Sequence, residues 1–143
     1  MFERILMVCT GNLCRSPMAG AWLRHRLGER PIEVRSAGLA ARVGEPAPAH
    51  AVAVLAKRGV DLSAHRARQL TTEDVLGSDL VLVMEDWQKE EVQRRTAAAR
   101  GRTYLLGHWQ GIEISDPYGA PEAVFEGVFA QIDQAVDAWL AHL

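Results

Sequence analysis

An apolar run near the start of the chain leads directly into a loop with two cysteines and then into an amphipathic stretch. Residues 5–9 are apolar throughout, and residues 9–17 read CTGNLCRSP. Apolar residues at helical spacing follow, so the pattern predicts a buried strand, a tight loop and a helix. Such a loop lies at the carboxyl end of its strand, where backbone N–H groups and the positive end of the new helix can converge on an anion.

Apolar runs alternate with helical patterns along the rest of the chain. The predicted strands are residues 5–9, 32–35, 80–84 and 103–106. The predicted helices are residues 17–27, 49–58, 71–76, 86–99 and 121–143, and residues 36–48, rich in Gly and Pro, are predicted to form a surface loop. Continuous apolar strands separated by helices are typical of a parallel sheet covered on both faces. We therefore expect a single α/β domain over residues 1–143.

Composition excludes several classes of protein. The formal net charge of −2 argues against general nucleic-acid binding. No apolar stretch approaches the roughly 18 residues of a membrane span, and the N-terminal run is too short for a signal peptide. The two cysteines, Cys9 and Cys14, are too few for a disulfide framework or a four-thiolate metal site. A soluble, cytoplasmic protein without membrane insertion is expected.

The cysteine loop carries a thiol at one end and a guanidinium at the other. The thiolate is the reactive form of cysteine, and a helix N-terminus, converging amides and a guanidinium all favour it. Arg15 can hold two oxygens of a phosphoryl group in a bidentate fork, and Gly11 permits close backbone approach. Ser16 can donate its hydroxyl to the sulfur. Cys9 is interpreted as a nucleophile, against the alternative of a small buried side chain at a strand end.

Two interpretations of Cys14 stay open. It is either a small loop side chain or a partner for a reversible disulfide with Cys9, because a closed loop brings its ends together. An accessible thiolate beside a second thiol is the pattern of a redox-sensitive site.

A second chemical signal lies at residues 115–119, SDPYG. Transfer of a phosphoryl group to sulfur leaves an alkoxide or phenoxide that needs a proton, and Asp116 is the candidate acid. Pro117 favours an extended conformation for Asp116. A plain turn is the alternative, because Asp-Pro and Gly also form turns. Tyr118 either forms an aromatic wall for a flat substrate or packs on the surface.

Because it contains both motifs, the chain resembles the low-molecular-weight protein tyrosine phosphatases, and the resemblance covers nearly its whole length. CTGNLCRSP resembles the family's phosphate loop, C-x5-R-S, and the Asp-Pro-Tyr of residues 116–118 resembles its acid loop. Residues 36–38 (SAG), 64–69 (AHRARQ) and 105–109 (LLGHW) are similar to family segments as well.

The resemblance implies hydrolysis of phosphotyrosine through a phosphocysteine intermediate, without a metal or organic cofactor. The implied fold is a four-stranded parallel sheet of flavodoxin-like type with flanking helices. Cys9 is then the nucleophile and Arg15 the clamp on the phosphate and the transition state. Ser16 stabilises the thiolate, and Asp116 acts first as acid and then as base.

The resemblance also implies which residues bind substrate and support the loop. Asn12, Ser36 and His65 would form a hydrogen-bond network that holds the loop in shape, whereas the residues alone suggest only a surface or capping role for His65. Leu39, with small neighbours, and Tyr118 would wall the site. The other substrate-binding residues belong to the loop: Thr10, Gly11, Asn12, Leu13 and Cys14.

The segment from residue 36 to 39 and the single aromatic of the acid loop resemble the bacterial branch of the family. Those enzymes act on autophosphorylated tyrosine kinases of capsule or exopolysaccharide export. The expected partner is therefore a phosphotyrosine protein of this kind, with inorganic phosphate as product.

Two alternatives remain. A thioredoxin-linked arsenate reductase shares the loop and fold, but it relays a disulfide to further cysteines, and none follows Cys14. A phosphotyrosine-binding module without turnover is the other, against which the presence of Cys9, Arg15 and Asp116 argues.

Overall fold

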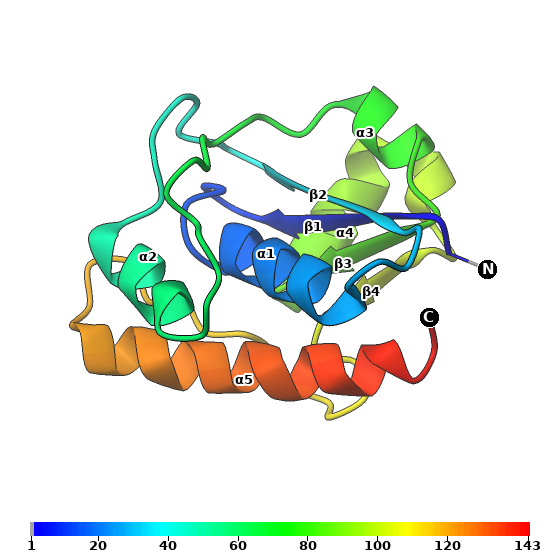
Figure 1. Ribbon diagram of the computed structural model, residues 1–143. Helices are drawn as coiled ribbons and strands as arrows, with labels where there is room; N and C mark the ends of the chain where they lie inside the picture. Colours follow the sequence, from blue (N-terminus) through cyan, green and yellow to red (C-terminus); the bar gives the residue numbers. More distant parts are fainter. Residues whose placement is uncertain (1) are drawn as a thin grey trace.

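A four-stranded parallel sheet forms the centre of the computed structural model, which describes residues 2–143. Its strands are β1 (Arg4–Cys9), β2 (Glu33–Gly38), β3 (Leu80–Val83) and β4 (Thr103–Leu105), in the order β2-β1-β3-β4 (Figure 1). The helices are α1 (Arg15–Leu27), α2 (Ala49–Ala56), α3 (Thr72–Leu76), α4 (Asp86–Arg95) and α5 (Glu122–Leu140). The predicted α/β class, the parallel sheet and its coverage on both faces are confirmed.

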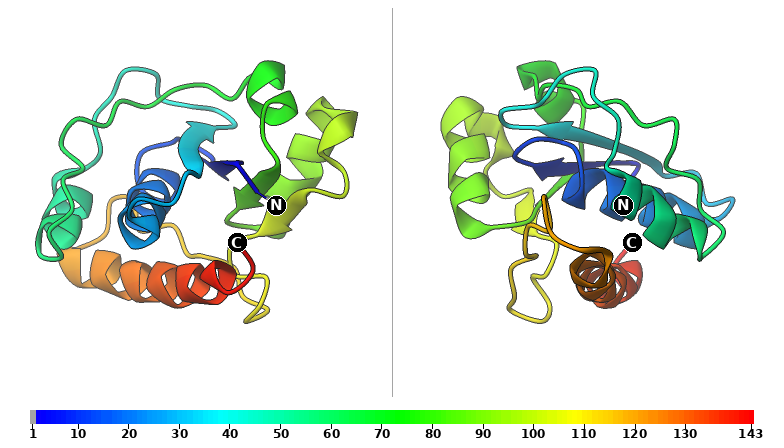
Figure 2. Two further views of the ribbon diagram at one scale, coloured as in Figure 1. Left: turned by 45° about the vertical axis from the view of Figure 1, so that its right-hand side comes forward. Right: turned by 90° about the vertical axis from the view of Figure 1, so that its left-hand side faces the viewer.

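Helices cover the sheet on both faces because the central strands are apolar on both sides. Along β1, Ile5 and Met7 pack into one core with α1, α2 and α5, whereas Leu6 and Val8 pack into the other with α3 and α4. Figure 2, left, shows the strands between these two groups of helices. A strand buried on both faces has no polar side, which is why β1 and β3 are continuous apolar runs.

Three predicted boundaries are wrong by three or four residues, and several others differ by one or two. Residues 36–38 extend β2 instead of opening a loop, because Ser36 pairs with Met7 and Gly38 with Cys9. The predicted helix 86–99 is interrupted at Thr96, which is extended (φ −139°, ψ 101°), and a 3₁₀ turn over Ala97–Ala99 follows. The last helix ends at Leu140 rather than at residue 143.

Three loops meet at the carboxyl edge of the sheet. They follow β1, β3 and β4, and β1 lies at the point where the strand order reverses, which is where open α/β sheets bind ligands. The end of β2 closes tightly on the first loop: a Cβ on Gly38 would lie 2.6 Å from the Thr10 carbonyl oxygen. Only glycine fits there without displacing the backbone.

None of the helices in residues 2–143 is long and apolar enough to cross a membrane.

Candidate active site

The loop between β1 and α1 depends on the backbone conformation of Asn12. Asn12 has φ +57° and is the only residue other than glycine with positive φ in residues 2–143. Asparagine adopts this left-handed conformation more readily than most residues. Its side chain is fully buried, and its Nδ2 donates to the hydroxyls of Ser16 (2.8 Å) and Ser36 (3.0 Å).

The other polar atoms of Asn12 are bound by a more distant segment. The Asn12 carbonyl oxygen accepts from His65 Nε2 at 2.7 Å, and Asn12 Oδ1 accepts from the Arg68 backbone N–H at 2.9 Å. A carbonyl can only accept, so His65 carries its proton on Nε2. Burial lowers the pKa of His65, and this neutral ring is sufficient for the contact.

Cys9 lies at the floor of the loop, with its sulfur next to a hydroxyl. Its Sγ is 2.9 Å from Ser16 Oγ. Because Ser16 Oγ already accepts the N–H of Asn12, its own proton is free to point at the sulfur. A hydroxyl that donates to sulfur stabilises negative charge there.

Arg15, the first residue of α1, is buried, and its guanidinium points across the site. Its Nη1 donates to Glu85 Oε2 at 2.7 Å and to the Ile114 carbonyl at 3.0 Å. Its Nη2 lies 4.0 Å from Asp116 Oδ2. These contacts fix the plane of the guanidinium and leave Nη2 on the side of Asp116.

Glu85 and Gln88 belong to the site, and the sequence did not single them out. Gln88 is fully buried; its Oε1 accepts the backbone N–H groups of Met84 and Glu85, and its Nε2 donates to Thr10 Oγ1 at 3.0 Å. Glu85 therefore follows β3 in a fixed conformation, aimed at Arg15. The sequence signal that could have identified them is their position: polar residues that follow a buried strand lie at the carboxyl edge of the sheet, where the site is.

Asp116 and Tyr118 complete the site from the loop after β4. The Asp116 side chain is 56% exposed, and its Oδ1 accepts the Tyr118 backbone N–H at 3.1 Å, which is a local turn contact. Asp116 therefore both forms a turn and lies beside Arg15, so the two interpretations of this residue are compatible. Its carboxylate faces both solvent and the pocket.

These residues surround one cavity of about 230 Å³. Its lining residues are Cys9, Thr10, Gly11, Leu13, Cys14, Arg15, Ala40, Arg42, Asp116 and Tyr118. A thiol at the floor, a guanidinium on the wall and a carboxylate at the mouth can together bind a phosphoryl group and move a proton.

Comparison with known proteins agrees with this geometry. The family model described as low molecular weight phosphotyrosine protein phosphatase matches residues 4–143. The chain belongs to this family. Its members are cysteine-dependent protein-tyrosine phosphatases, and so is this chain.

Individual relatives are similar over nearly their full length. A protein of Ralstonia nicotianae described as a probable low molecular weight protein-tyrosine-phosphatase, EpsP, is 45% identical over 143 residues, which is 100% of this chain and 97% of the relative. The crystal structure of the Erwinia amylovora tyrosine phosphatase AmsI has a TM-score of 0.94 and 42% identity, covering 100% of this chain and 94% of that one. Vibrio vulnificus Wzb in complex with benzylphosphonate has a TM-score of 0.94 and 38% identity, covering 100% of both chains.

Two residues expected at the pocket of this phosphatase, Asn12 and Leu39, do not line the cavity. Asn12 is fully buried and supports the loop. Leu39 is buried in the core on the α3 and α4 side and does not line the cavity. It continues the alternation of β2, so its side chain faces the same way as Ala37. Ala40 and Arg42 take the expected place, and Arg42 Nη1 donates to the Tyr118 hydroxyl at 2.7 Å.

Both cysteines of the phosphatase are free thiols in this structure. Burial raises the pKa of Cys14 to about 12, with further increases from the charges of Asp116 and Cys9 and an opposing effect of Arg15. Cys14 is therefore protonated at neutral pH. Neither interpretation of Cys14, a small loop side chain or a partner for a reversible disulfide with Cys9, is decided by this.

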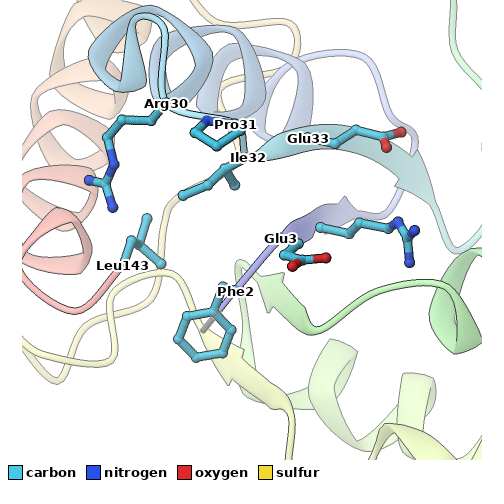
Figure 3. A pocket seen from close by; sticks show the side chains of 8 residues that line it. Phe2, Glu3, Arg30, Pro31, Ile32, Glu33 and Leu143 are labelled. Carbon is cyan, nitrogen blue, oxygen red and sulfur yellow. The ribbon is translucent and has the colours of Figure 1, made fainter.

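A larger hollow at the opposite end of the sheet has different chemistry. It has a volume of about 790 Å³, and Figure 3 shows Phe2, Ile32 and Leu143 around it. Within residues 2–143, the side chains that line it include no cysteine, serine, threonine or histidine. It offers no thiol for a cysteine-dependent reaction, so the smaller cavity above Cys9 is the candidate active site of the phosphatase.

Proposed function

We propose that this phosphatase hydrolyses phosphotyrosine in proteins through a phosphocysteine intermediate. The observation that carries the proposal is the meeting of Cys9, Arg15 and Asp116 in one cavity, with the Ser16 hydroxyl 2.9 Å from the sulfur. Each group matches one requirement of a two-step phosphoryl transfer.

In the first step, the Cys9 thiolate attacks phosphorus and the bond from phosphorus to the tyrosine oxygen breaks. The phosphoryl group moves to sulfur, and protonated Asp116 gives its proton to the leaving phenolate. Arg15 binds two phosphoryl oxygens as charge builds on them. The N-terminal N–H groups of α1, which lack partners within the helix, face the same anion.

In the second step, water attacks the phosphocysteine and transfers a proton to the Asp116 carboxylate. The bond from sulfur to phosphorus breaks, inorganic phosphate leaves, and the Ser16 hydroxyl stabilises the returning thiolate. Both steps use the chain's own side chains, and the loop groups proposed to bind the phosphate are those of Thr10, Gly11, Asn12, Leu13 and Cys14.

The proposed substrate is an autophosphorylated tyrosine kinase of polysaccharide export, met in the cytoplasm. The resemblance of the acid loop and of residues 36–39 to the bacterial branch supports this assignment. An exposed Tyr118 and a small Ala40 at the cavity also leave room for a tyrosine presented on a protein surface.

Hydrolysis of p-nitrophenyl phosphate and of a phosphotyrosine peptide tests the mechanism. Cys9→Ser should lose essentially all activity. Asp116→Asn should lose roughly 10²–10⁴-fold with the peptide and less with the better nitrophenolate leaving group. Asp137→Asn is the matched control, because Asp137 is an aspartate on α5 that pairs with Arg26.

Two results would contradict the proposal. A wild-type protein that binds phosphotyrosine without turnover would be a binding module. An acid variant equally impaired with both substrates would show that Asp116 does not protonate the leaving group. Capture of a phosphorylated kinase by Cys9→Ser, reversed by vanadate, tests the assignment of the partner.

A further inference from the structure

A second polar cavity lies along β2, the edge strand of the sheet. It has a volume of about 320 Å³ and shares no lining residue with the cavity above Cys9. Val34, Ser36 and His65 line it together with four arginines, and no acidic residue does. We call this cavity the arginine groove; its arginines are Arg24, Arg35, Arg66 and Arg68.

Two of the four guanidiniums have no carboxylate partner. Arg35 pairs with Glu33, and Arg68 pairs with Asp74. No carboxylate in residues 2–143 lies within 4.0 Å of the guanidinium of Arg24 or Arg66, so the groove holds a local excess of positive charge on a chain whose net charge is −2.

Contacts within the fold use only some of the arginine donors. Arg24 Nη1 donates to the Val34 carbonyl at 2.9 Å, and Arg68 Nη1 donates to the Ser36 carbonyl at 2.9 Å. These bonds cover the open edge of β2. Arg66 uses Nη1 alone, on the carbonyls of Ser63 and His65. Each guanidinium has five N–H donors, so most of those on Arg24 and Arg66 remain for a ligand.

The groove is connected directly to the phosphate loop. Three of its lining residues, Ser36, His65 and Arg68, each form a hydrogen bond with Asn12. Asn12 is the residue whose positive φ shapes the loop. A ligand that shifts these three residues therefore acts on the backbone around Cys9 without entering the catalytic cavity.

We propose that the arginine groove binds a phosphate group, either free phosphate or a second phosphorylated side chain of the protein substrate, and that its occupancy acts on the phosphate loop through Asn12. Guanidiniums bind the oxygens of a tetrahedral dianion in bidentate fashion. Two uncompensated guanidiniums match the charge of one phosphate dianion. The Ser36 hydroxyl accepts from Asn12 Nδ2, so its own proton is free to be donated to a phosphate oxygen.

Titration with inorganic phosphate, at constant ionic strength, tests the site without relying on turnover. The ring signals of His65 and the amide signal of Gly11 are followed by NMR. We expect two separate binding curves: the Gly11 signal responds mainly to the catalytic cavity and the His65 signal mainly to the groove, and each shows a smaller response to the other site through Asn12. Arg24→Gln/Arg66→Gln should weaken the His65 curve by about tenfold or more, since each bond to a charged group contributes substantially.

Arg100→Gln is the control, because it removes the same charge from an exposed position outside the groove. If the double variant fails to fold, Arg66→Gln alone serves, since Arg66 contacts only neighbouring carbonyls. The proposal is overturned if His65 follows the Gly11 curve in wild type and variant alike, or if neither bis-phosphorylated peptide nor phosphate moves the His65 signals separately.

A second measurement distinguishes the two sources of phosphate, and only this part rests on the proposed function. KM is compared for peptides with one and with two phosphotyrosines. A lower KM for the second peptide that disappears in the double variant identifies the substrate as the source. Equal KM values with a separate phosphate curve identify free phosphate. Absence of turnover would reject the proposed function, but the phosphate titration would still test binding in the arginine groove.

Discussion

Replacing Glu85 by alanine removes the only carboxylate that touches the Arg15 guanidinium within hydrogen-bond distance in the described residues. The contact is 2.7 Å long, and the Arg15 side chain is 3% exposed whereas that of Glu85 is 32% exposed. Breaking a buried ion pair costs about 3–5 kcal/mol. Part of this is recovered here, because Glu85 is partly solvated and the Ile114 carbonyl remains in place.

We therefore expect a loss of about 2–3 kcal/mol in transition-state stabilisation, which corresponds to roughly 30–150-fold in kcat/KM. Glu85→Gln keeps a hydrogen-bond acceptor and loses only the charge, so about tenfold is expected. Because Arg15 acts most strongly on the charged transition state, the loss should lie mainly in kcat.

Steady-state hydrolysis of a phosphotyrosine peptide measures both parameters. Glu113→Ala is the matched control, since the Glu113 carboxylate lies nearby on the Asp86 backbone N–H and does not pair with Arg15. A folded Glu85→Ala variant whose kcat/KM stays within about threefold of wild type, a difference under 1 kcal/mol, would refute the positioning argument.

Three further outcomes are expected. Iodoacetamide at neutral pH should label Cys9 and spare Cys14, whose pKa of about 12 keeps it protonated; equal labelling in peptide mass spectra would contradict this. The lowered pKa of His65 means that the unfolded chain takes up a proton first as pH falls through 6.5, so the free energy of unfolding should decrease by at most about 1.4 kcal/mol per pH unit from this group. Urea unfolding of His65→Gln should show a smaller decrease between about pH 7 and pH 5, and an unchanged decrease would count against it. Gly38→Ala should lower the melting temperature, because the new Cβ would meet the Thr10 carbonyl at 2.6 Å, at a cost of about 1–3 kcal/mol. Gly127→Ala, in open space on α5, should not, and similar melting temperatures for the two variants would be inconsistent with the crowding.

The sequence predicts the fold well where apolar pattern and structure coincide. β1 and β3 are buried on both faces, so their apolar runs mark them directly. The end of β2 was not predicted because its residues are not apolar. Ser36 accepts a hydrogen bond from Asn12, and Gly38 leaves space for the Thr10 carbonyl.

The site divides along a similar line. Cys9 and Arg15 lie in one local motif, so their spacing carries a signal. The residues next to Asp116 are compatible with either a turn or a catalytic acid. Only the folded structure shows that its carboxylate lies 4.0 Å from the Arg15 guanidinium. Glu85 contacts Arg15, and Arg42 contacts Tyr118, in each case across at least 70 residues of sequence. Contacts between such distant residues leave no pattern in the local sequence.

The shape of the phosphate loop also has a consequence for when the enzyme becomes active during synthesis. The segment that holds Asn12 ends at Arg68, the anchor of Arg15 lies at Glu85, and the acid comes only at Asp116. A nascent chain that has released its N-terminal half carries the nucleophile and the residues that hold Asn12, but it still lacks the anchor of Arg15 and the acid. Catalytic competence therefore arrives late in translation, when most of the polypeptide has emerged and docked.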